Sequence, residues 1–318
     1  MSRYVIDKKL LDENIEIVKQ KAGVPLIGVV KGNGYGFGIK EITKILVEHG
    51  IKTFAVTEVT DLPILREVLT DEDILVMRST CIKDECREIA KYGATATIGS
   101  LQAGQAMSDV ATEMGVTVKC HLKIDTGMGR YGFMPSEIED AIKCYSLPNL
   151  EFTGAYTHFS SAFRNHDLTK AQLEMFKDTM AKIKEKVGNV GILHASNSPA
   201  LLNVEDVCLD TVRIGSAFTG RVITKNKSGL HRLGSLEAEV VDVKTVPKGY
   251  FVGYNATYQT KRETKIAIVP IGHYDGFGLT KEKEIITFRY VLSVFKSFLK
   301  KKQMYVCRRG GRCHGVRT

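Results

Sequence analysis

The sequence predicts an α/β protein: an N-terminal (β/α)8, TIM-like barrel followed by an incomplete, mostly β C-terminal domain. Between about residues 24 and 218, eight short apolar runs alternate with amphipathic stretches, and such alternation implies parallel strands joined by crossovers. Eight units in this length of chain fit a closed barrel. After residue 233 the chain alternates and becomes rich in Val, Thr and Tyr, which predicts antiparallel strands.

The apolar runs place the barrel strands. In chain order we predict strands at residues 24–30, 53–59, 74–79, 94–100, 116–124, 150–159, 191–197 and 211–218. The amphipathic stretches predict helices at residues 39–50, 62–70, 82–93, 102–115 and 169–188, most of which end in glycine, as helix C-caps often do. An open doubly wound sheet is the alternative. It usually has fewer strands and often carries GxGxxG after the first strand, which is missing here.

The distribution of charge helps to divide the chain. We expect the barrel to occupy residues 1–225 and the β-rich domain residues 226–318, because residues 220–235 are polar and contain glycine. The net charge is +9, but nine of the 45 Lys and Arg residues lie in residues 286–318, where there is no Asp or Glu. The remainder has 36 basic and 36 acidic residues. The basicity therefore belongs to a tail, and we expect no specific nucleic-acid binding.

Composition excludes several other classes of protein. The 43% hydrophobic and 25% charged residues are typical of a soluble globular chain, and no apolar run approaches the ~20 residues of a membrane span. The N-terminal stretch has charges inside it, unlike a signal peptide. Seven cysteines without a CxxC pair favour a reduced, cytoplasmic protein. Eight histidines without HxH or HExxH spacing predict no metal site.

Chemistry-bearing residues follow most of the predicted strands, at the end where such barrels place their reactive groups. They are Lys31 after the first strand, Lys123 and Arg130 around the end of the fifth, His158 in the sixth, Asn197 and Ser198 around the end of the seventh, and Arg213, Gly215 and Ser216 in the eighth. The loops after strands seven and eight often bind phosphate. A strand-end lysine opposite a phosphate site suggests pyridoxal phosphate, which needs a lysine, a phosphate cradle and a partner for its ring nitrogen.

Six segments carry a resemblance to a known family. They are VVKGNGYGFG (29–38), KIDTGMGRYGF (123–133), YTHF (156–159), HASNSPA (194–200), VRIGSAF (212–218) and GYNATYQT (253–260). In this order they resemble the alanine racemases, barrel-type pyridoxal-phosphate enzymes, and the resemblance runs from the N-terminus to about Gly278. It implies a homodimer with shared active sites. It also implies interconversion of L- and D-alanine, which supplies D-alanine for peptidoglycan.

The resemblance also implies roles for individual residues. Lys31 holds the cofactor and is one of two bases, and Tyr254, from the partner subunit, is the other. Arg213 faces the pyridine nitrogen, and His158 packs at the ring. Tyr35 and Ser198 bind phosphate oxygens, and Arg130 bonds the phenolic oxygen and binds the substrate. Asn197, Gly215 and Ser216 are further expected cofactor-binding residues. Lys123 resembles the family's carbamylated lysine, which orients that arginine.

The chain departs from the family pattern at two places. His273 stands where many members have tyrosine after PIG, which suggests an altered substrate preference. After Gly278 we find neither the family's Met-Asp segment nor its late tyrosine, so we expect weak activity or none from these 318 residues. The alternatives are a serine/alanine racemase of broader specificity and a cofactor-binding protein without turnover. KIDTGMGRYG and GYNATY argue against a barrel-type decarboxylase.

Overall fold

The computed structural model describes residues 2–222, 224, 228–277, 307–308 and 311–312. The chain forms two compact units, Ile6–Leu233 and Met1–Val5 together with Gly234–Thr318. The domain boundary predicted between residues 225 and 226 falls outside the described residues, as does most of the basic tail. Among the described residues, no helix is long and apolar enough to cross a membrane.

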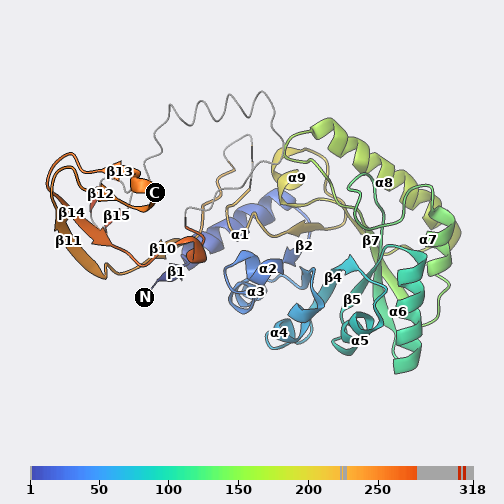
Figure 1. The fold of residues 1–318 in the computed structure, drawn as a ribbon. Helices are drawn as coiled ribbons and strands as arrows, with labels where there is room; N and C mark the ends of the chain where they lie inside the picture. The colour runs from blue at the N-terminus through green and yellow to red at the C-terminus, as the bar shows by residue number, and fades with distance from the viewer. Residues whose placement is uncertain (1, 223, 225–227, 278–306, 309–310, 313–318) are drawn as a thin grey trace. The chain divides into compact units, whose positions relative to one another are not determined.

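The first unit is built around one parallel sheet, in the order β8-β7-β6-β5-β4-β3-β2-β9. Its strands are β2 (Leu26–Val29), β3 (Thr53–Val56), β4 (Asp73–Ser79), β5 (Thr95–Ile98), β6 (Val118–Lys123), β7 (Leu150–Tyr156), β8 (Ile192–His194) and β9 (Val212–Ile214). A parallel bridge between His194 and Thr211 brings the two ends of the sheet together. The predicted eight-stranded barrel is confirmed and nearly closed (Figure 1).

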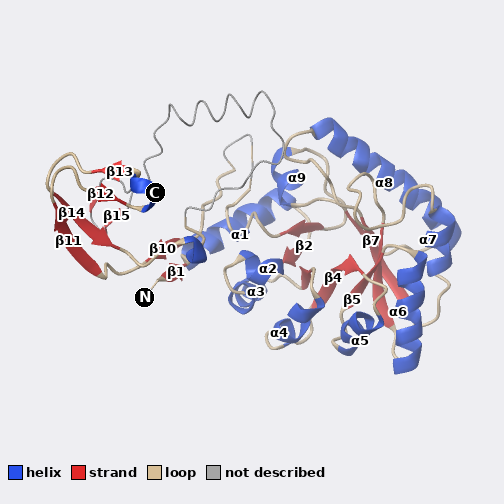
Figure 2. Cartoon of the chain, viewed as in Figure 1, coloured by secondary structure: helices blue, strands red, loops and turns tan. Residues whose placement is uncertain are grey.

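Helices cover the outside of these strands (Figure 2). They are α1 (Lys8–Ala22), α3 (Ile39–Glu48), η1 (Val59–Asp61), α4 (Leu62–Arg66), α5 (Lys83–Lys91), α6 (Leu101–Met114), α7 (Ile138–Cys144), α8 (His166–Val187) and α9 (Ser198–Asn203). The short segment α2 (Lys31–Tyr35) is instead a left-handed turn at the carboxyl end of β2. The five predicted helices correspond to α3, α4, α5, α6 and α8. The others, including the 15-residue α1 with its Asp7 cap, lie outside the predicted set.

The barrel strands are buried on both faces, which explains their nearly continuous apolar sequence. The outward faces pack against the helices in the main core, where Phe54 and Leu46 are fully buried. The inward faces form a smaller cluster of Ile27, Val29, Ala55, Leu75 and Tyr156. Polar side chains at the carboxyl ends of the strands therefore stand above an apolar floor.

The second unit consists of antiparallel pairs, as predicted. β10 (Ser235–Glu237) pairs with β1 (Arg3–Val5), and β11 (Asp242–Val246) pairs with β14 (Thr264–Ile268). The shorter elements are β12 (Phe251–Val252), η2 (Tyr254–Ala256), β13 (Tyr258–Gln259), η3 (His273–Asp275), β15 (Cys307–Arg308) and β16 (Gly311–Arg312). The mostly β character of this unit is confirmed.

Candidate active site

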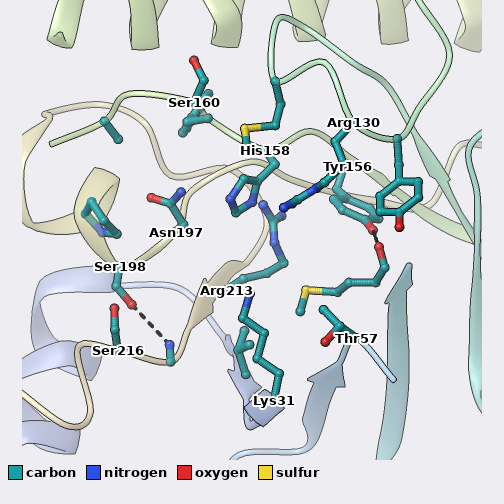
Figure 3. Close-up of a pocket in the computed structure, with 18 of the residues that line it drawn as sticks. Lys31, Thr57, Arg130, Tyr156, His158, Ser160, Asn197, Ser198, Arg213 and Ser216 are labelled. Carbon is teal, nitrogen blue, oxygen red and sulfur yellow. Dashed lines mark hydrogen bonds between the residues drawn. The ribbon is translucent and has the colours of Figure 1, made fainter. Parts of the chain in front are cut away.

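A cavity of about 500 Å³ lies at the carboxyl ends of the barrel strands. Its lining includes most of the residues singled out from the sequence: Lys31, Tyr35, Lys123, Arg130, His158, Asn197, Ser198, Arg213, Gly215 and Ser216. Figure 3 shows Lys31 and Arg213 pointing toward the centre of the cavity, beside His158. Tyr254 does not line this cavity. It belongs to the second unit, where its side chain is 96% exposed.

A left-handed turn follows Lys31 and explains the glycine-rich sequence there. The five residues 32–36 all have positive φ, between 52° and 84°, a conformation that costs free energy for every residue type except glycine. Glycine occupies three of these five positions. Asn33 closes the turn, because its backbone oxygen accepts from Gly38 N (3.0 Å) and its side chain accepts from Ile39 N (3.0 Å). The turn brings Tyr35 into the cavity.

Tyr35 contributes to a cluster of hydroxyl and backbone N–H groups on one wall. Its hydroxyl lies where a Cβ on residue 215 would be, so only glycine leaves room for it there. Ser198 Oγ accepts from the backbone N–H groups of Gly215 and Ala217, each at 3.2 Å (Figure 3 draws the first). Burial raises the pKa of Tyr35 to about 12, which keeps its phenol a proton donor. Such a wall can bind phosphate oxygens.

Arg213 lies beneath the cavity with its guanidinium held by several acceptors. It is 2% exposed and donates from Nη2 to the carbonyl oxygens of Thr157 (2.7 Å) and Ala195 (2.9 Å). Its Nη1 lies 2.6 Å from Nδ1 of His194, whose Nε2 lies 2.9 Å from Nδ1 of His121. Because a guanidinium can only donate, His194 Nδ1 accepts and its Nε2 carries the proton. Burial, followed by the charge of Arg213, lowers the pKa of both histidines and keeps their imidazoles neutral.

Positive charge dominates the lining of the cavity. Its cationic side chains are Lys31, Arg78, Lys123, Arg130 and Arg213, and the lining contains one carboxylate, that of Glu58. Burial, followed by the charges of Arg130 and Arg213, lowers the pKa of Lys31. Burial and Arg213 similarly lower the pKa of Lys123 to about 7. This field attracts anionic groups and raises the neutral, nucleophilic fraction of Lys31.

His158 is kept neutral by the same surroundings. Burial lowers its pKa to about 2, with further lowering by Arg213, Lys123 and Arg130. A neutral imidazole can pack against a flat ring without adding to the positive charge. This suits the predicted place of His158 beside a cofactor.

The loop that carries Arg130 is organised by the carboxylate of Asp125. Asp125 Oδ1 accepts from the backbone N–H groups of Gly127 (2.9 Å), Met128 (2.8 Å) and Gly129 (3.1 Å). Its Oδ2 accepts from the N–H of Arg130 (3.1 Å). The carboxylate thereby holds the backbone of Arg130 in place within the loop that follows β6.

The sequence reasoning did not single out Tyr156, His194, Asp125 or Gln172. Tyr156 stands two residues before His158, and the alternation of a strand could have found it. Its ring stacks on His194 (centroids 4.9 Å apart) and lies 4.3 Å from Lys123 Nζ. The short side chain of Asp125 before a glycine-rich loop is a turn signal. His194 and Gln172 give no such signal.

Together, a parallel barrel, a strand-end lysine of lowered pKa and a facing phosphate-type wall define a barrel-type pyridoxal-phosphate enzyme. The family model "Alanine racemase, N-terminal domain" matches residues 6–222, and "Alanine racemase, C-terminal domain" matches residues 233–290. The chain therefore belongs to the alanine racemase family, whose members are pyridoxal-phosphate-dependent isomerases. The family predicted from the six segments is confirmed.

Individual relatives agree with this placement. The alanine racemase of Methanococcus maripaludis is 33% identical over 282 residues, which cover 86% of this chain and 75% of that protein. The solved alanine racemase of Clostridium difficile 630 superposes with a TM-score of 0.82 at 28% identity, over 87% of this chain and 74% of the other. The Bacillus anthracis alanine racemase, solved with bound L-Ala-P, gives 0.77 at 29% identity, with the same shares covered.

Proposed function

We propose that this chain binds pyridoxal phosphate through Lys31 and interconverts L- and D-alanine by a two-base mechanism. The observation that carries the proposal is the geometry of the cavity. It sets a lysine of lowered pKa opposite a wall of hydroxyl and backbone N–H groups. Its relatives are alanine racemases, which supports alanine as the substrate.

The residues present fit this cofactor. Tyr35, Ser198 and the 215–217 backbone would hold the phosphate, and Gly215 lets the Tyr35 hydroxyl reach this wall because it lacks a Cβ. Arg213 would face the ring nitrogen. Arg130 would bond the phenolic oxygen and the substrate carboxylate, while Asn197 and Ser216 complete the wall. When bound, pyridoxal phosphate supplies the carbonyl carbon that joins an amine and the ring that acidifies the substrate Cα–H.

The chain's own residues would then control the protons. Lys31 takes or gives the Cα proton on one face, and its lowered pKa suits a base at neutral pH. Burial lowers the pKa of Arg213 to about 10, so it stays charged at neutral pH. Three of its donor contacts already go to carbonyl oxygens, those of His194, Thr157 and Ala195. A permanently charged guanidinium has no proton to give the ring readily, which limits reactions other than racemisation.

Racemisation also needs a base on the opposite face of the substrate. We propose Tyr254 of a partner subunit, in a homodimer that shares its active sites. The side chain is 96% exposed among the described residues, which leaves it accessible to the cavity of a partner subunit. The product would supply D-alanine for peptidoglycan. Five cysteines, Cys81, Cys86, Cys120, Cys144 and Cys208, are free thiols, which supports a reduced, cytoplasmic setting.

Lys31→Ala tests the cofactor assignment directly. Purified unmutated chain incubated with pyridoxal phosphate should show a protein-bound visible absorbance band, and Lys31→Ala should lack it. Borohydride reduction and peptide mapping should label Lys31. Lys119→Ala is the matched control, because Lys119 is exposed on β6 and pairs with Asp73 at 3.0 Å. A label on another lysine, or a band that survives Lys31→Ala, would contradict the assignment.

Racemisation assays on alanine and serine then decide the substrate. We expect turnover of alanine to exceed that of serine. A larger kcat/KM for serine would favour the broader serine/alanine activity.

A further inference from the structure

We propose that Gln172, on α8, is a positioning residue that ties the loop carrying Arg130 to the segment carrying His158. Its catalytic consequence rests on the proposed function. The structural coupling between the two loops can be tested without it.

Gln172 stands out among the buried polar residues of α8. Thr169, Gln172 and Thr179 are all buried in this helix. The two threonines satisfy their hydroxyls within the helix, by donating to Asn165 O (2.8 Å) and Met175 O (2.7 Å). The hydrogen bonds of Gln172 all go to residues outside the helix, although the side chain is 1% exposed. A buried amide with only external partners indicates a connection between elements.

Each end of the Gln172 amide holds a different loop. Nε2 donates to the carbonyl oxygen of Thr126 (3.1 Å), which lies between Asp125 and the glycines that lead to Arg130. Oε1 accepts from both the backbone N–H (3.1 Å) and the hydroxyl (3.2 Å) of Ser160, two residues after His158. One side chain therefore links the ends of strands β6 and β7.

A second contact extends this link toward Arg213. The hydroxyls of Thr126 and Thr157 lie 2.8 Å apart, and the carbonyl of Thr157 accepts from Arg213 Nη2 (2.7 Å). Thr126, Thr157 and Gln172 thus form a continuous hydrogen-bond network. It connects the segments that carry Arg130 and His158 with Arg213. A shift of Thr126 would therefore displace both Arg130 and Arg213.

The chemistry of the network requires an amide at position 172. One end must donate and the other must accept, and only an amide or a protonated carboxyl of this length does both. Gln172→Leu would leave the carbonyl of Thr126 and the N–H of Ser160 buried without these partners. Gln172→Glu cannot donate while ionised, so the carbonyl of Thr126 would lose its partner.

Hydrogen–deuterium exchange in the full chain tests the coupling itself. In Gln172→Leu, peptides covering residues 124–133 and 157–164 should both exchange about tenfold faster than in the unmutated chain. Thr179→Val is the control, since it removes a buried hydrogen bond within the same helix. It should leave both peptides unchanged. Faster exchange in only one peptide, or an equal effect of Thr179→Val, would overturn the proposal.

Gln172→Glu tests the hydrogen bonds separately from packing, because its ability to donate depends on pH. Because position 172 is buried, the pKa of the new carboxyl should be raised, and its protonated form can again donate to Thr126 and accept from Ser160. Exchange protection in both peptides, relative to the unmutated chain at the same pH, should therefore recover as pH falls from about 9 to about 6. If the exchange rates of Gln172→Glu relative to the unmutated chain do not change with pH, the proposal is overturned. This outcome can be read even if Gln172→Leu fails to fold.

Activity adds the functional part of the test. We expect Gln172→Leu to lower kcat/KM for racemisation about 10- to 100-fold, and the Gln172→Glu defect to shrink toward low pH. If the unmutated chain shows no cofactor band and no turnover, the proposed function fails, but the exchange result still decides the role of Gln172. Normal kcat/KM in a Gln172→Leu chain with loosened loops would limit Gln172 to structure and overturn its role in positioning.

Discussion

Several residues of the cavity have shifted pKa values because they are buried beside positive charges. Lys31, Lys123 and His158 all have lowered pKa values because desolvation disfavours their charged forms and neighbouring arginines add to the effect. Lys123 makes the point most clearly. It is 3% exposed, and its Nζ lies 4.3 Å from the ring of Tyr156. The protonation of Lys123 therefore depends on folding, and the stability of the fold depends on pH.

Lys123→Met should stabilise the protein more at about pH 7 than at about pH 9.5. The folded pKa of about 7 lies below the ordinary value of 10.5. Between these values the unfolded chain binds a proton that the folded chain does not. Keeping Lys123 neutral thus costs stability near pH 7, and the cost shrinks as pH rises toward 10.5. Denaturant unfolding of both chains at the two pH values measures the difference.

The family resemblance implies a carbamylated Lys123, which would lack this titration. A stability difference that does not change with pH would therefore contradict an unmodified lysine and favour carbamylation.

At the scale of elements, short loops carry the site and are stabilised by their own hydrogen bonds. The loop after β6 is the clearest case, since four successive backbone N–H groups converge on Asp125. Burial alone raises the pKa of Asp125, but these four donors outweigh it and hold the pKa below 3.8. The loop is therefore most stable with the carboxylate ionised.

Asp125→Asn should destabilise the protein by about 1–3 kcal/mol at neutral pH. An amide nitrogen cannot accept, so the N–H of Arg130 or those of its neighbours lose their acceptor. Because the folded pKa is depressed, this contribution is present above the ordinary pKa of 3.8 and is lost as pH falls through the lower folded value. Urea unfolding at neutral and acidic pH measures both effects, and kcat/KM should fall with the displacement of Arg130.

Asp140→Asn is the control for that experiment. Asp140 is half exposed and pairs with Lys143 across one turn of α7 (2.7 Å), and such surface pairs contribute only about 0–1 kcal/mol. An equal loss of stability in the two variants would show that Asp125 does not hold its loop as proposed.

At the scale of the whole molecule, the two proposed bases belong to different compact units. Lys31 lies in the Ile6–Leu233 unit, and Tyr254 lies in the unit that begins again at Gly234. Their separation of more than 200 residues supports a site shared between subunits, because symmetric dimers can exchange such contributions reciprocally.

A mixture of inactive Lys31→Ala and inactive Tyr254→Phe chains should recover activity after subunit exchange. Each hybrid dimer would contain one site with both intact bases and one site with neither. Random pairing makes about half of the dimers hybrids, so about a quarter of the activity of the unmutated dimer should return. Racemisation assays before and after mixing measure the recovery, and native mass spectrometry monitors exchange. Exchange without recovery, when the unmutated chain is active, would mean that the bases are not shared.

The sequence alone predicted the barrel and many of the residues that line its cavity. Strands buried on both faces must be apolar, so the eight strands were readable from hydrophobic runs, and the strand-end rule brought Lys31, Arg130, His158 and Arg213 together. The glycines after Lys31 also had a local cause, since a left-handed turn excludes most other residues. Each of these features depends on short stretches of chain.

Only the tertiary structure decided which groups touch and what charge they carry. Gln172 contacts Thr126, 46 residues away, and His194 contacts His121, 73 residues away. No local pattern records such pairs, because they arise only when the folded barrel brings α8 against the loop after β6 and brings β8 near β6. The lowered pKa values of Lys31 and Lys123 have the same origin. They follow from burial beside Arg130 and Arg213, and that burial exists only once the barrel has closed around them.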